Sequence, residues 1–117
     1  MNPEEFVENI KLEIESTVSL YSEGANGQTE LGSKLDSLNL SSIQREEVLS
    51  LIKLGIEVST FTLISAIEGS ASLNDSQEMY KVISENGDEL TGELDDLFYE
   101  KVIEQPFSKP FKRNKNI

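Results

Sequence analysis

The longest stretch with helical spacing covers residues 41–69, and its second half is apolar on nearly every side. Between Val48 and Ile67 only Lys53 and Glu57 carry charge. A helix that is apolar all round is usually a buried helix. We therefore expect this segment to be the central helix of the fold, with the other elements packed around it.

Local signals mark both ends of this central helix. Ser41 followed three residues later by Gln44 predicts a capping box at the start, and Gly69 predicts the end. Gly55 interrupts the middle, which indicates close packing of another element against the backbone or a kink. The side chains that we expect to be buried on this helix are Val58, Phe61, Ile64 and Ile67.

Glu57 is the one acid in the apolar half of the central helix. One interpretation places it on a solvent-facing edge. The other makes it a buried carboxylate, which in an enzyme could act as a general base. The sequence leaves both interpretations open.

A second long helix is predicted near the N-terminus, followed by a short helix. Asn2 and Pro3 are typical of a helix start, and Gly24 marks the end. Thr29 predicts the cap of a short helix over residues 30–38. The long helix carries an apolar stripe that we expect to pack on the central helix, formed by Phe6, Val7, Ile10, Ile14, Val18 and Tyr21.

The pattern changes after Gly69. Residues 78–84 contain Tyr, Val and Ile between turn residues and predict a strand. Asn86-Gly87 is a strong signal for a hairpin turn, and residues 88–91 would form the returning strand. A last helix follows and stops before Pro106. The predicted fold class is thus α+β and mainly α, with two long helices, a short helix, a small β-hairpin and a C-terminal helix around the buried central helix.

Composition sets the domain organisation. The 117 residues fit one domain. The chain holds 22 acids and 10 bases, a net charge of −12. Four of the bases lie in residues 107–117, so residues 1–106 carry 22 acids and 6 bases, a net of −16. We expect residues 1–106 to form a single acidic globular domain and residues 107–117 to be a basic, flexible tail.

Charge and composition narrow the function classes. A body of net −16 repels phosphate, which argues against direct binding of nucleic acid and favours a basic protein partner. The chain has no cysteine and no histidine, and no nucleophile or phosphate-binding motif. Calcium-loop frames starting at Asn86 or Asp88 place Leu90 where an oxygen ligand is needed. We expect no enzymatic activity, no metal and no cofactor. We see no signal peptide or membrane span and expect a cytoplasmic protein.

The densest run of acids lies between residues 85 and 104. One interpretation is a solvated face that has no binding role and keeps the protein soluble. Its functional interpretation is a docking surface for a basic partner, with an aromatic residue as anchor. The residues that we expect to bind the partner are Glu85, Asp88, Glu89, Glu93, Asp95, Asp96, Tyr99 and Glu100.

Residues 63–100 resemble small acidic bacterial proteins that share three short motifs. In this chain the motifs are Ile67-Glu68-Gly69, Asn86-Gly87, and Leu94-Asp95-Asp96-Leu97-Phe98-Tyr99. Proteins of this appearance are often immunity proteins encoded beside toxins. The resemblance implies an immunity-type inhibitor that neutralises a basic effector such as a nuclease toxin. The alternative is a non-enzymatic interaction or adaptor domain with an unrelated partner.

Overall fold

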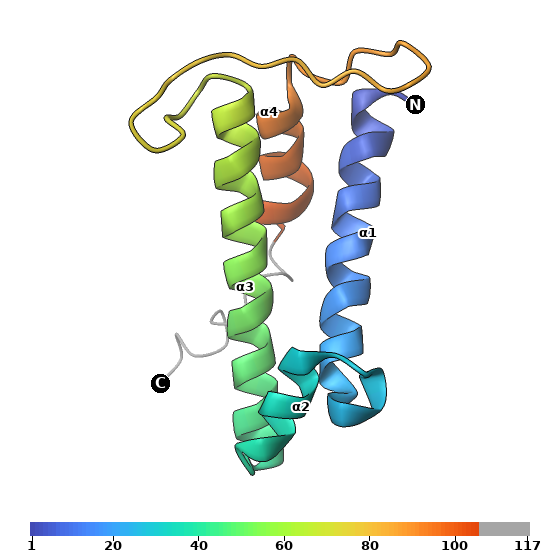
Figure 1. Cartoon of the computed structure of the whole chain (residues 1–117), viewed down its shortest axis with the longest axis vertical. Helices are drawn as coiled ribbons and strands as arrows, with labels where there is room; N and C mark the ends of the chain where they lie inside the picture. Colours follow the sequence, from blue (N-terminus) through green and yellow to red (C-terminus); the bar gives the residue numbers. More distant parts are fainter. Residues whose placement is uncertain (106–117) are drawn as a thin grey trace.

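The computed structural model describes residues 1–105, which form four α-helices and two short helical turns (Figure 1). Helices α1 and α3 run side by side in opposite directions, α2 crosses one end, and α4 lies between the two long helices. The predicted tail, residues 107–117, lies outside the described residues. In chain order the elements are α1 (Pro3–Ser22), the 3-10 turn η1 (Gly24–Gly27), α2 (Glu30–Ser37), α3 (Ser42–Ile67), α4 (Leu94–Phe98) and the π-helical turn η2 (Tyr99–Ile103).

The helix starts follow the local signals in the sequence. At α1 the Asn2 side chain accepts a hydrogen bond from the Glu5 N–H at 2.8 Å, and the Glu5 carboxylate accepts from the Asn2 N–H at 3.1 Å. At α3 the same reciprocal capping box joins Ser41 and Gln44. Thr29 caps α2, as predicted. These caps each involve residues three apart, so a short window of sequence is enough to predict them.

The core lies where α1, α3, α4 and η2 meet. Phe61 and Phe98 stack across this contact with their ring centroids 6.4 Å apart. The predicted packing is confirmed for Phe6, Ile10 and Ile14, which belong to this cluster, whereas Val18 and Tyr21 of the same stripe are half-buried and lie outside it. The buried members of the cluster are Val7, Ile14, Ile64, Leu94, Phe98 and Val102.

Burial of α3 is one-sided, so the prediction of a helix surrounded on all sides was wrong. Ile64 is buried, Phe61 and Ile67 are half-buried, and Val58 is 47% exposed. The physical reason is that α1 and α4 pack along only part of α3 and leave the rest open to solvent. Space is also open around Gly55, where a side chain would meet no atom within 4 Å, so close packing does not explain that glycine in the part of the chain that the structure describes.

The α+β assignment is contradicted, because no β-strand or sheet is present within residues 1–105. The predicted turn does form: Gly87 has φ +92° and donates its N–H to the Ser84 carbonyl at 2.9 Å. Beyond it, Ile83 and Glu89 make a single isolated bridge. Residues 88–91 are poor in strand formers, and a lone two-stranded hairpin is marginal in water. The segment instead crosses the end of the helices as extended chain (Figure 1).

The opposite end is held by Asp36 of α2. Its carboxylate accepts a hydrogen bond from the Ala25 N–H at 2.8 Å and pairs with the Arg45 guanidinium of α3 at 2.9 Å. Arg45 also donates to the Ser22 carbonyl at 3.3 Å. The hydrogen bond from the Ala25 N–H, and then the hydrogen bond from the Arg45 guanidinium, lower the pKa of Asp36 below 3.8. One carboxylate thus joins the end of α1, η1, α2 and the start of α3.

We predict that Phe98→Ala lowers the free energy of unfolding by about 3–5 kcal/mol, because the ring is fully enclosed and its loss leaves a cavity. Val58→Ala is the control: it removes exposed surface and should change stability by less than about 0.5 kcal/mol. Urea unfolding followed by circular dichroism measures both. Equal losses in the two variants would mean that the core is wrongly placed.

We also predict that Asp36 makes the fold sensitive to acid. Since its folded pKa is lowered, its contribution to stability is complete above the unfolded pKa of 3.8 and is lost as the pH falls through the lower folded value. Unfolding midpoints measured from pH 6 to pH 2.5 should therefore fall less steeply below pH 4 in Asp36→Asn than in the wild type. Glu47→Gln, an exposed neighbour of Arg45 in sequence, should keep the wild-type slope. Identical slopes for all three proteins would contradict the role of Asp36.

Candidate functional site

The predicted partner-binding residues lie on three consecutive parts of the chain. Glu85, Asp88, Glu89 and Glu93 lie on the α3–α4 connection, residues 68–93, which crosses one end of the helices (Figure 1). Asp95 and Asp96 lie in α4, and Tyr99 and Glu100 in η2. All eight are exposed except Asp95, which is half-buried.

Glu68 fixes the position of these residues, and sequence reasoning gave it no role. Its carboxylate is buried at 7% exposure. It accepts hydrogen bonds from the Gly92 N–H at 3.0 and 2.8 Å, and from the Leu94 N–H at 2.7 Å. A carboxylate at this place satisfies N–H groups at the start of α4 and interacts favourably with the helix dipole. The donors are backbone groups 24 and 26 residues away, so no local pattern identifies them.

Further bonds hold the first part of the connection against α3. The Tyr80 N–H donates to the Ile67 carbonyl at 2.9 Å, and the Gln77 amide donates to the Gly69 carbonyl at 2.9 Å. The Ser70 hydroxyl donates to the Asp95 carboxylate at 2.6 Å. The connection is therefore anchored at the end of α3 and again at the start of α4.

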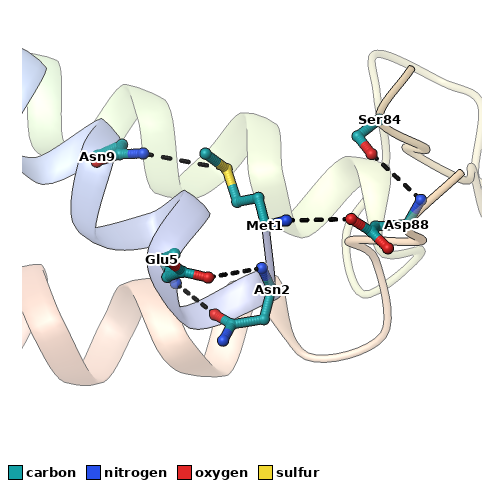
Figure 2. A network of polar contacts seen from close by, with 6 residues as sticks. All are labelled: Met1, Asn2, Glu5, Asn9, Ser84 and Asp88. Atoms are coloured by element: carbon teal, nitrogen blue, oxygen red, sulfur yellow. Dashed lines mark hydrogen bonds and ion pairs between the residues drawn. The ribbon is translucent and has the colours of Figure 1, made fainter. Parts of the chain in front are cut away.

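The turn of the connection also contacts the N-terminus of the chain (Figure 2). The Met1 ammonium lies 3.1 Å from the Asp88 carboxylate, and the Asp88 N–H donates to the Ser84 hydroxyl at 3.2 Å. This contact spans 87 residues and brings Glu4 and Glu5, the acids in the first turn of α1, to the same end of the molecule. We call this region the acidic end: Glu4, Glu5, Glu85, Asp88, Glu89, Glu93 and Asp95.

Most of the acidic end lacks neutralising partners. Within residues 1–105 the ion pairs are Met1–Asp88, Lys34–Glu30 and Arg45–Asp36, and the last two lie at the opposite end. Among the eight predicted residues only Asp88 is therefore ion-paired in this part of the chain. Exposed carboxylates without cationic partners leave a negative potential around this end.

The remaining predicted residues form a separate group along the helix. Asp96, Tyr99 and Glu100 are exposed on α4 and η2, beyond the acidic end. The Tyr99 ring is 45% exposed and tilted against Phe61, with the centroids 5.6 Å apart. Its other face is thus available to a partner while Phe61 fixes its position.

Glu57 is 3% exposed, so the solvent-facing interpretation was wrong and the buried one is correct. It lines a cavity between α1, α3 and η2 together with Lys11 and Lys53. Within residues 1–105, no three side chains of the metal-binding types, which here are Asp and Glu, are grouped so that they could hold a metal ion.

Comparison with known proteins gives no further assignment: no protein-family model matches the chain, and no curated protein or solved structure shows significant similarity. The resemblance to immunity proteins therefore stays a prediction. By length and composition alone, α3 is long and apolar enough to cross a membrane, and only 17% of its most apolar window is buried. The cytoplasmic location also stays a prediction.

We predict that Glu68→Gln destabilises the protein by about 2–3 kcal/mol, because the amide replaces a charged acceptor and turns an NH2 group toward backbone N–H donors. Amide hydrogen exchange at Gly92 and Leu94 should be faster in Glu68→Gln than in the wild type. Glu93→Gln removes an exposed charge beside the same residues and should leave both quantities nearly unchanged. If the two variants behave alike, the buried carboxylate does not hold α4 in place.

Proposed function

We propose that this chain is a non-enzymatic, immunity-type inhibitor that binds a basic effector, such as a nuclease toxin, through its acidic end and blocks it. The observation that carries the proposal is the exposure of the acids at one end, of which only Asp88 is ion-paired within residues 1–105. A nuclease surface is already positive for its own substrate, so an acidic inhibitor complements it.

The way the acids are held supports rapid capture. Glu68 fixes the start of α4, and Met1 fixes the turn of the connection, so the carboxylates are placed before a partner arrives. A pre-organised surface loses less conformational entropy on binding. The concentrated negative charge raises the rate of encounter with a positive partner.

Individual acids in the interface should contribute differently. Exposed carboxylates at the rim act mainly on the association rate and its dependence on salt. A carboxylate that becomes buried against a partner arginine or lysine acts on dissociation, and its truncation costs about 2–5 kcal/mol. Tyr99, with one face against Phe61 and the other exposed, is the best candidate for an apolar anchor beside the acids.

We predict that reversing two acids of the acidic end slows association with the product of the neighbouring gene by about tenfold or more at low salt. The variant is Glu85→Lys with Glu89→Lys, which leaves the Met1–Asp88 contact intact. Stopped-flow mixing over a range of salt concentrations measures the rate, and a cleavage assay of the effector measures the inhibition.

The matched control is Glu46→Lys with Glu47→Lys, an equal change in net charge on exposed residues near the start of α3, far from the acidic end. Reversals at Glu4 would be a poor control, because that residue lies in the first turn of α1, at the acidic end. Equal slowing by both pairs would show that only total charge matters and that docking occurs elsewhere. Absence of binding by the neighbouring gene product would remove the immunity role and favour an adaptor with another partner.

A further inference from the structure

A cavity of about 170 Å³ lies between α1, α3 and η2, away from the acidic end, and it gathers an unusual share of the positive charge. Residues 1–105 contain 22 acids and only 6 bases. Three of those bases line this one cavity: Lys11 of α1, Lys53 of α3 and Lys101 of η2. Half of the bases in this acidic part of the chain therefore surround a single cavity.

The same sequence pattern is used on each of the three segments. Each lysine is followed four residues later by a polar residue that also lines the cavity. On α1 and α3 that residue is Glu15 and Glu57, whereas the third position is the neutral Gln105. The lining therefore carries three positive and two negative charges, a net of +1.

The lysines are not consumed by ion pairs within the part of the chain that the structure describes. The ion pairs there involve Met1, Lys34 and Arg45 as the cations. A lysine that precedes glutamate by one helical turn has the less favourable order for a helix ion pair, in agreement with the absence of an ion pair between Lys11 and Glu15 within residues 1–105. All three lysines are half-buried, so part of their hydration is lost.

We propose that this cavity binds one small oxyanion, a phosphate or carboxylate group, between the three lysines. A cavity of about 150 Å³ can hold a benzene molecule, so this one accommodates a phosphate ion or a short organic acid and excludes a nucleotide. Ile14 and Val102 are buried beside the lysines and give the cavity an apolar floor for a short carbon chain. Glu15 and Glu57 limit the anion to low charge.

The site is independent of the proposed capture of a basic effector. Its lining has the opposite sign of charge, and it shares no residue with the acidic end. Loss of one function leaves the other intact, so the two proposals can fail separately.

The test titrates the full chain with sodium phosphate and, separately, sodium acetate, with sodium chloride adjusted to keep the ionic strength constant. We expect saturable chemical-shift changes at the amides of Ile14 and Val102 and a saturable rise in Tm with at least one of the two anions. Lys53→Met should weaken binding at least tenfold. Lys34→Met makes the same charge change at an exposed site far from the cavity and should bind as the wild type does.

Gln105→Glu is a second variant, which adds a negative charge instead of removing a positive one. It supplies a third carboxylate and brings the net charge of the cavity lining to zero. It should also weaken binding at least tenfold, while Gln44→Glu, an equal charge change at the capping box of α3, should not. The proposal is overturned if neither anion gives a saturable response at constant ionic strength. Equal effects of Lys53→Met and Lys34→Met, or of Gln105→Glu and Gln44→Glu, would also overturn it and leave the lysines as covers for apolar surface.

Discussion

The hydrogen bonds from the Gly92 and Leu94 N–H groups to the buried Glu68 carboxylate hold the start of α4 against the end of α3. Helix α4 has only five residues, too few to be stable alone. Yet it supplies Leu94 and Phe98, two of the most deeply buried side chains in the core. Glu68 places the first turn of α4 directly beside the end of α3, so core packing and the position of the acidic end both depend on one carboxylate.

Features that depend on nearby residues could be predicted from the sequence. The cap at Asn2, the capping box at Ser41 and a turn containing Asn86 and Gly87 all appear where they were expected. Features that depend on distant partners could not. A β-hairpin requires a ladder of hydrogen bonds between its two strands, and residues 88–91 form only one isolated bridge with the preceding segment. Full burial of α3 requires helices packed on all its sides, and within residues 1–105 helices pack on only part of it. The helical pattern of α3 was strong, but apolar composition alone does not specify what packs on it.

In the candidate site, too, features that depend on nearby residues were predictable and those that depend on distant residues were not. Exposure of the acids could be predicted from their density and their turn context, and the structure agrees for all of them except the half-buried Asp95. The contact between Met1 and Asp88 and the role of Glu68 join positions far apart in the chain through an ammonium group and backbone amides, which leave no pattern in the sequence. The burial of Glu57 is similar: a lone acid in an apolar helix has two plausible environments, and only the packing of α1 and η2 against α3 decides between them.

The open side of α3 has a consequence for the protein in concentrated solution. Leu51, Val58 and Leu63 are each about half exposed there, and exposed apolar surface promotes association between molecules. At neutral pH the net charge of −12 opposes such association by mutual repulsion. Near the isoelectric point of 4.3 that repulsion disappears, only slightly above the pH at which Asp36 begins to lose its bonds. Colloidal and conformational stability therefore decline over adjoining ranges of pH, and mild acidification should precipitate the protein before it unfolds.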